Sequence, residues 1–221
     1  MPTDPSRRPP QPPAPQQARA KRTQERILAA AEQLLRERLF EEVTVAAIAA
    51  RAKVAVGTVY LRFAAKEDLL PVLFARHHAA AAGAVDALLE ALRRDPNLRG
   101  RIRRLVAFTV AYHRGRRGLL RALTMYTRAH PGEIDEAVFR DRAAQYERVA
   151  EAVAGDAPQL RQRGARPRLR FALELLNAHC REHLLFGETT VHRSAPTPNL
   201  ERHLTDTLFF FLCRDRGASS H

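Results

Sequence analysis

Apolar residues recur at every third or fourth position along most of this chain, with charged and amide residues between them. The first segment of this kind begins at Thr23, a residue type that often caps a helix N-terminus, and ends near Leu39. One face of the segment gathers five apolar side chains: Ile27, Leu28, Ala31, Leu34 and Leu35. This spacing predicts an amphipathic helix whose apolar face is buried.

The same periodicity predicts a second helix that begins at Thr44, another suitable N-cap, and runs through TVAAIAARA. A third, very short helix is expected within KVAVGTVYLRF at 53–63. A fourth begins near Lys66 and continues to about Leu92. Pro71 lies inside this fourth helix, and because proline has no backbone N–H we expect a kink there.

Turn signals divide the rest of the chain into further helices. They begin after DPN (95–97), after GRRG (115–118), at HPGE (130–133), at Arg168 and at Leu200. Strand-forming residues are sparse and no internal repeat is visible. The pattern therefore predicts an all-α protein with about nine helices.

Composition divides the chain into four parts. Residues 1–20 contain seven of the fourteen prolines, so we expect a disordered tail, and a solvated extension is favoured there over contact with a phosphate backbone. Residues 21–66 form a three-helix head and residues 67–213 a helical body. Residues 214–221 are expected to be a flexible tail.

The chain carries a formal charge of +13, which permits a polyanionic partner such as nucleic acid. Arginine is spread along the whole chain, however, and a general compositional bias would produce the same charge. No apolar run is long enough to span a bilayer, and the N-terminus has no signal-peptide core, so we expect a cytoplasmic protein without a membrane partner. Cys180 and Cys213 are too few for a disulfide framework.

The short third helix has one apolar face and one polar face. Val59 and Phe63, at i and i+4, are expected to face the core. The outward positions are then Gly57, Thr58, Tyr60, Leu61 and Arg62. Two short helices joined by a tight turn indicate a helix-turn-helix, whose second helix lies in the DNA major groove. A plain connector would also bury two apolar residues, but it would not explain the outward Gly-Thr-x-Tyr.

The outward residues are suited to DNA. The hydroxyls of Thr58 and Tyr60 suit phosphate oxygens, and Lys66 adds a positive charge beside them. Gly57 lets the backbone approach closely. Contacts with thymine methyl groups are expected from Val56 and Leu61.

Residues 26–70 read RILAAAEQLLRERLFEEVTVAAIAARAKVAVGTVYLRFAAKEDLL. This run resembles the N-terminal signature of the TetR-type transcriptional regulators. The shared elements are an alanine- and leucine-rich first helix, an aromatic residue and a threonine before the second helix, and the pattern xGTxYxxFxxKExLL. The remainder resembles the family only in length and all-helical pattern. The resemblance implies a dimeric DNA-binding regulator. It further implies a repressor that a small molecule releases from its double-stranded DNA operator.

By this resemblance, Thr44, Thr58, Tyr60 and Lys66 fall at positions that touch phosphates, and Val56, Gly57 and Thr58 lie near base edges. The sequence departs from the family pattern at two positions. Lys53 stands where glycine is usual in the turn. Glycine is common there because the backbone is often left-handed, so the sequence leaves open whether Lys53 adopts that conformation in spite of its Cβ. Ala65 replaces the usual serine cap of the fourth helix, at a cost of about 1 kcal/mol.

Two apolar stripes near the C-terminus are expected to form the homodimer interface. They comprise Leu169, Leu173, Leu176, Cys180 and Leu184 on one helix and Leu200, Leu204, Leu208, Phe211 and Leu212 on the other. Two copies would pack these helices as a four-helix bundle around a two-fold axis. The alternative is that the stripes belong to the core of a single chain.

The body is also expected to hold a pocket for a small-molecule ligand whose identity the sequence does not specify. The residues that suggest it mix apolar surface with hydroxyl and amide groups: Phe108, Tyr112, Met125, Tyr126, Phe139, Tyr146 and Asn177. A solidly packed body would instead indicate a DNA-binding regulator or architectural protein with no small-molecule inducer.

Other candidate sites are weaker. His179 and His183, with Cys180 between them, could form one edge of a metal site, but no third ligand has suitable spacing. No HExxH, Gly-x-Ser-x-Gly or phosphate-binding glycine loop occurs, so we expect no enzyme, cofactor or metal. The arginine-rich part at 93–128, opposed only by Asp95, is either a solvated face or a site for an anionic ligand or acidic partner.

Overall fold

The computed structural model describes residues 15–133, 135–161, 164–187 and 199–213. All regular structure in these residues is helical, which confirms the predicted all-α class. The α-helices are α1 (Pro15–Glu37), α2 (Val45–Ala52), α3 (Val56–Tyr60), α4 (Leu69–Arg93), α5 (Leu98–Arg114), α6 (Arg117–Ala129), α7 (Glu136–Ala154), α8 (Ala165–Cys180) and α9 (Leu200–Cys213). Short 3-10 turns at Phe40–Glu42, Pro131–Glu133 and Pro158–Leu160 lie between them, and a π-helical turn, Arg181–Leu185, continues α8.

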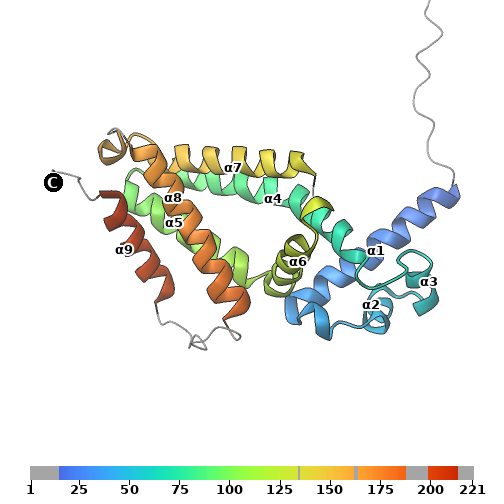
Figure 1. Ribbon diagram of the computed structural model, residues 1–221. Coiled ribbons are helices and arrows are strands. Elements are labelled where there is room, and N and C mark those ends of the chain that lie inside the picture. Colours follow the sequence, from blue (N-terminus) through green and yellow to red (C-terminus); the bar gives the residue numbers. More distant parts are fainter. Residues whose placement is uncertain (1–14, 134, 162–163, 188–198, 214–221) are drawn as a thin grey trace, which may run out of the picture.

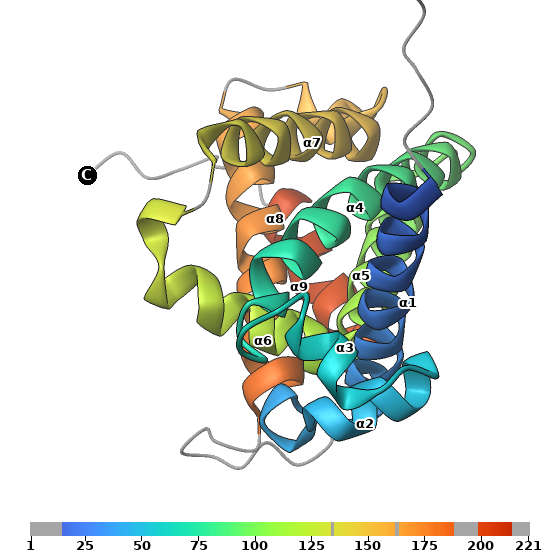
Figure 2. The same ribbon diagram turned by 90° about the vertical axis from the view of Figure 1, so that its right-hand side faces the viewer.

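The helices form a head and a body (Figures 1 and 2), each with its own hydrophobic core. The head core combines α1, α2 and α3 with the start of α4 and one face of α6. The body core combines the end of α4 with α5, α7, α8 and α9. Figure 1 shows α4 running from the head towards the body, with α6 between them. The head is therefore completed by α6, a segment that lies far along the sequence.

Helix α1 is longer than the sequence predicted. It begins at Pro15, and the hydroxyl of Thr23 donates to the Arg19 carbonyl (3.0 Å) from inside the helix. Thr23 is therefore not the N-cap, and residues 15–20 are helical where a disordered tail was expected. The reason is that proline is tolerated in a first helical turn and that alanine, glutamine and arginine favour a helix. Residues 1–14 and 214–221 lie outside the described part of the chain.

The start of α4 also corrects a prediction. Asp68 accepts the backbone N–H of Ala65 through its carboxylate (2.8 Å), so the chain before α4 retains part of a capping interaction although the usual serine is missing. Pro71 is only the third residue of the helix. Backbone N–H groups in a first turn have no partner within the helix, so proline there removes no hydrogen bond. The physical reason for the expected kink is therefore absent.

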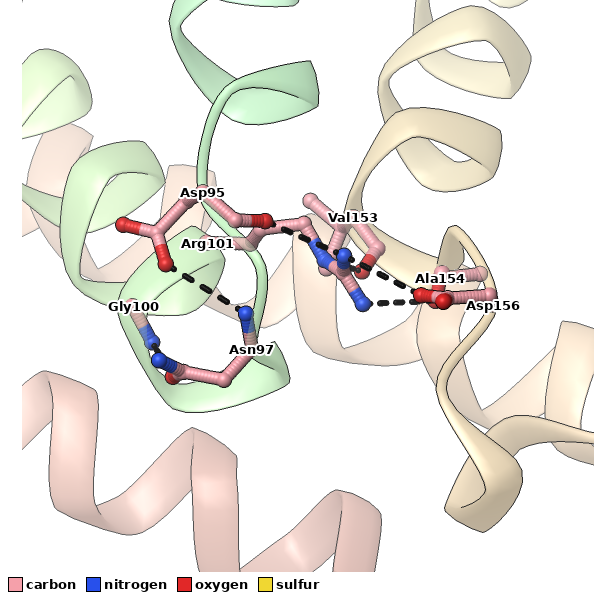
Figure 3. Close-up of polar contacts among 7 residues, drawn as sticks. All are labelled: Asp95, Asn97, Gly100, Arg101, Val153, Ala154 and Asp156. Carbon is pink, nitrogen blue, oxygen red and sulfur yellow. Dashed lines mark hydrogen bonds and ion pairs between the residues drawn. The ribbon is translucent and has the colours of Figure 1, made fainter.

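Arg101 ties the turn between α4 and α5 to the end of α7 (Figure 3). Its guanidinium is almost fully buried and donates to the backbone carbonyls of Val153 (2.9 Å), Asp95 (3.2 Å) and Ala154 (3.1 Å). The Asp156 carboxylate lies 3.6 Å away. Two of these carbonyls belong to the last turn of α7, where a helix leaves its carbonyls without internal partners. One cation thus caps α7 and fixes α5 against it.

Within the described residues, no helix is both long and apolar enough to cross a membrane.

Replacing Arg101 with methionine should lower the free energy of unfolding by about 3 kcal/mol, because three carbonyls would lose a charged donor. Urea unfolding followed by circular dichroism measures the loss. The matched control is Arg103→Met, at an exposed position on the same helix, which should change stability by less than about 0.5 kcal/mol. Equal stability of the two variants would contradict the proposed role of Arg101.

Candidate nucleic-acid interface and ligand cavity

The turn between α2 and α3 is fixed by backbone capping. Lys53 adopts the left-handed conformation (φ 55°, ψ 49°) at the end of α2, which answers the question that its sequence position raised. The guanidinium of Arg26, from α1, donates to the carbonyls of Ala52 (2.5 Å) and Lys53 (2.8 Å). At the other end of α2, the Thr44 hydroxyl accepts the N–H of Ala47 (3.1 Å), which confirms the predicted N-cap. The angle between α2 and α3 is thus set by contacts within the head.

Helix α3 presents one face to the core and one to solvent. Val59 and Phe63 are buried in the head core, as predicted from their spacing. On the other side Val56 and Tyr60 are exposed, and Leu61 is 85% exposed. A row of exposed large apolar and aromatic side chains on a rigid helix is typical of a binding surface.

Gly57 lies at the centre of this exposed face. A Cβ at this position would meet no atom within 4 Å, so nothing within the described protein requires a glycine here. The only constraint that would favour glycine is the approach of something from outside. Thr58 is half-buried beside it and Arg62 is exposed, so these two also reach the same surface.

Lys66 makes a contact within the head. Its ammonium donates to the Phe40 carbonyl (2.9 Å) and lies 4.4 Å from the centre of the Phe40 ring. Lys66 is half-buried and joins the segment before α4 to the 3-10 turn before α2. Its predicted contact with a phosphate stays a prediction.

A cavity of about 410 Å³ lies in the body between α4, α5, α6, α7 and the end of α8. Four of the seven residues predicted for a pocket line it: Phe108, Tyr112, Tyr146 and Asn177. The other three do not. Met125 and Phe139 are exposed, and Tyr126 is buried in the head core, where its hydroxyl donates to Glu133 (2.5 Å). Periodicity could not show which face of α6 meets the head and which meets the cavity.

The sequence prediction missed the basic residues of the cavity wall. These are His77 and His78 on α4, His113 on α5, Arg128 on α6, Arg142 on α7 and Arg181 after α8. One signal was available in the sequence. The pair His77-His78 interrupts the run LLPVLFARHHAAAAGAV, which is otherwise nearly all apolar.

His77 is held neutral in the wall of the cavity. Burial, together with the positive charges of Arg116 and Arg142, lowers the pKa of His77 to about 4. Its Nε2 lies 3.1 Å from the Tyr112 hydroxyl, and burial raises the pKa of that tyrosine. The Tyr112 ring stacks on Phe108, with centroids 5.7 Å apart. Aromatic surface with a few neutral polar groups is a common lining for a ligand site.

The residues predicted for the dimer interface pack inside the single chain. Leu169, Leu173, Leu176, Cys180 and Leu208 are buried within the single chain, and Leu184, Leu204 and Phe211 are half-buried against the same core. Both C-terminal helices carry apolar residues on a second face, and it is this face that is exposed: Phe171 and Leu175 on α8 and Phe210, at 67% exposure, on α9. The predicted stripe is thus the core-facing one.

The possible metal edge is not completed. The rings of His179 and His183 stack with centroids 5.5 Å apart. Within the described part of the chain, no three histidine, cysteine, aspartate or glutamate side chains are grouped to hold a metal ion. Burial raises the pKa of the Cys180 thiol to about 11, so this sulfur is a poor ligand or nucleophile at neutral pH.

The cavity is connected to the head through α4 and α6. Arg76, adjacent to His77 on α4, forms ion pairs with Glu32 (3.0 Å) and Glu25 on α1. At the start of α6, a Cβ on Gly118 would lie 2.1 Å from the Arg38 carbonyl, so α6 approaches the chain after α1 as closely as a glycine allows. Both helices that link head and body therefore also line the cavity.

The depressed pKa of His77 makes stability depend on pH. The folded form holds the proton only near pH 4, while the unfolded chain binds it below its ordinary pKa of 6.5, so stability falls as the pH is lowered between these values. In His77→Gln the loss of unfolding free energy between about pH 7 and pH 4.5 should be smaller by about 2 kcal/mol. Urea titrations at both pH values measure it. His203→Gln, at an exposed position on α9, is the control, and an equal pH dependence in all three proteins would contradict the assignment.

Part of the head matches a known protein family. Residues 27–73, which span most of the head, match the sequence profile of the bacterial regulatory proteins of the tetR family. No curated protein sequence is significantly similar to the chain.

Solved structures share the fold. A protein from Mesorhizobium loti MAFF303099, assigned to the TetR-family transcriptional regulators, aligns with a TM-score of 0.55 at 20% identity and covers 88% of this chain and 96% of its own. The transcriptional regulator FadR from Bacillus subtilis, in complex with stearoyl-CoA, aligns with a TM-score of 0.51 at 17% identity, covering 84% and 97%. The multidrug binding protein EbrR, complexed with imidazole, aligns with a TM-score of 0.50 at 19% identity and covers 86% of this chain and 92% of its own. The head therefore matches the tetR family over residues 27–73, and the chain as a whole shares the fold of these solved structures.

Proposed function

We propose that this protein is a TetR-family transcriptional regulator that binds its operator as a homodimer and acts as a repressor that a small-molecule ligand releases from DNA. The observation that supports DNA reading most directly is the exposed face of α3 around Gly57. The observation that supports ligand control is the cavity of about 410 Å³, which borders both helices that lead to the head. That volume lies within the range of small-molecule sites, and it favours ligand control over a regulator without an inducer.

On DNA, α3 enters the major groove with its exposed face towards the bases. Val56 and Leu61 supply apolar contacts for thymine methyl groups, and Gly57 admits the groove edge. The hydroxyls of Thr58 and Tyr60 donate to phosphates and set the register. Thr44 retains its hydroxyl hydrogen for a further phosphate, because its oxygen is the acceptor in the cap of α2. Lys66, already bonded to Phe40, contributes to the local positive potential.

Dimerisation is expected because one five-residue helix reads too few base pairs for a specific site. Two heads bound one helical turn apart, about 34–36 Å, double the contact and require a palindromic operator. The face that carries Phe171, Leu175 and Phe210 is the part of the body that a second copy would cover. Three large apolar side chains on adjoining helices are unusual on a surface that has no partner.

Ligand control acts through the position of the heads. A ligand shifts the DNA-competent form only by the difference between its affinities for the two forms. Filling the cavity moves α4 and α6 relative to α5, α7 and α8, and Arg76 and Gly118 transmit that movement to α1. A coupling of about 3 kcal/mol would lower operator affinity by about 150-fold. The stearoyl-CoA and imidazole complexes of the two structural relatives support a ligand site in this fold.

Replacing Tyr60 with alanine should weaken binding to specific and unrelated DNA alike, since the residue contacts phosphate. Replacing Val56 with alanine should instead change which bases are preferred, at about 1–3 kcal/mol for the affected base pair. Fluorescence anisotropy on promoter fragments of the chain's own gene, at several salt concentrations, separates the two effects. Gln33→Ala, exposed on α1 outside the helix-turn-helix, is the control. If Tyr60→Ala bound the operator as tightly as the parent, α3 would not be the reading helix.

Introducing charge at Leu175 and Phe210 together, as Leu175→Glu with Phe210→Glu, should give a folded monomer that has lost specific operator affinity. Both side chains are exposed in the single chain, so the fold should persist. Sedimentation equilibrium reports the mass, and circular dichroism reports the helical content. The control is Met125→Glu, which places the same charge on an exposed apolar position of α6. A double variant that stayed fully dimeric would place the interface elsewhere.

A further inference from the structure

The charges that line the cavity are all of one sign. Three of its residues are arginines: Arg128 from the end of α6, Arg142 from α7 and Arg181 from the turn after α8. No aspartate or glutamate is among the described residues that line it. Arg142 is exposed and Arg181 is half-buried, which puts one charge at the mouth and the other deeper in the wall.

These arginines differ from several other arginines of the body. Arg99, Arg104, Arg148 and Arg170 each form an ion pair with a carboxylate. In the part of the chain that the structure describes, the guanidinium groups of Arg128, Arg142 and Arg181 form no hydrogen bond and no ion pair. A guanidinium next to a cavity and without a counter-ion is unfavourable unless water or a ligand solvates it.

Three acidic residues of the surrounding helices have partners other than the cavity arginines. Asp141 lies 3.5 Å from His78, Glu174 lies 3.1 Å from Arg170, and Glu32 pairs with Arg76 at 3.0 Å. None of the three forms an ion pair with Arg128, Arg142 or Arg181. Among the described residues that line the cavity, no carboxylate balances these arginines.

The other ionisable groups of the wall experience this positive charge. Burial raises the pKa of Tyr146, and the charges of Arg142 and Arg181 act in the opposite direction. Burial lowers the pKa of His113, and Arg181 lowers it further. The lowered pKa values of His77 and His113 favour the neutral form of both side chains, so these two histidines add no positive charge at neutral pH.

The rest of the lining is apolar or aromatic. Phe74, Val85 and Leu88 come from α4, Leu105 and Phe108 from α5, and Val149 from α7. The hydroxyl of Tyr146 forms no hydrogen bond with a described residue and can donate to a ligand oxygen. A ligand that satisfies all these groups has one anionic end and an apolar body.

We propose that the cavity binds an organic acid whose carboxylate lies between Arg142 and Arg181 and whose hydrocarbon part fills the apolar wall. The planar guanidinium forms paired hydrogen bonds with a carboxylate, which gives both charge and orientation. This inference rests on the proposed function for its regulatory meaning, although the binding itself does not require DNA. It specifies the class of the inducer.

The test compares compounds that differ in charge alone. Decanoate, decan-1-ol and decylammonium form one series, and 4-phenylbutyrate and 4-phenylbutan-1-ol form a second with an aromatic body. Calorimetric titration of the full-length protein without DNA should give at least about tenfold tighter binding for an acid than for its alcohol in one series or both. Decylammonium should bind more weakly than either.

Variants then locate the charge. In Arg142→Gln with Arg181→Gln the acid should lose its advantage over the alcohol, while the alcohol binds as before. Arg140→Gln, on α7 and outside the cavity lining, is the matched control and should keep the full preference. Because Arg142 is exposed, the single variant Arg142→Gln should fold normally and show part of the loss.

Three results would overturn the proposal: no acid of either series binds at about 1 mM, an alcohol or the ammonium binds as tightly as the acid, or the double variant keeps the preference. A separate measurement addresses the proposed function. Operator binding is titrated with whichever acid binds, and an acid that binds with the expected arginine dependence but never releases DNA would contradict ligand control alone.

Discussion

Helix α4 is buried at its two ends in two different hydrophobic cores. Residues 69–73 pack in the head core and residues 88–92 in the body core. At about 1.5 Å per residue the 25-residue helix extends roughly 37 Å, so it behaves as one rigid element shared by both. Neither core can move without displacing the helix. Because α6 completes the head core and lines the cavity as well, the packing of the head depends on what happens in the body.

The head shows how a very short helix can be held in a fixed position. Five residues are too few for a stable isolated helix, so α3 depends on its neighbours. Its inward side chains, Val59 and Phe63, anchor it in the head core. Lys53 holds the turn in a conformation that is costly for a residue with a Cβ, and the two hydrogen bonds from Arg26 offset that cost. The outward face of α3 makes no contribution to the head core and is exposed to a partner.

The arginines behind the net charge of +13 have different surroundings in different parts of the molecule. On the surface of the body most arginines meet a carboxylate, and Arg101 is used entirely inside the fold, where it caps α7. Around the cavity the arginines have no such partner among the described residues. A sum over the sequence cannot separate these cases, because it contains no information about which charges are neighbours. The distribution of partners, and not the total, distinguishes a solvated face from an anion site.

The sequence by itself determined the short helices of the head, because the interactions that shape them are local. Thr44 caps α2 three residues away, and Val59 and Phe63 share one helical face. In the body the same periodicity was ambiguous. Helix α8 has apolar residues on more than one face, and only packing against the other body helices decided that Leu173 is core while Leu175 is exposed. The tertiary structure likewise turned Tyr126 towards the head and brought Arg142 and Arg181 to one cavity, since both depend on contacts between segments far apart in the chain.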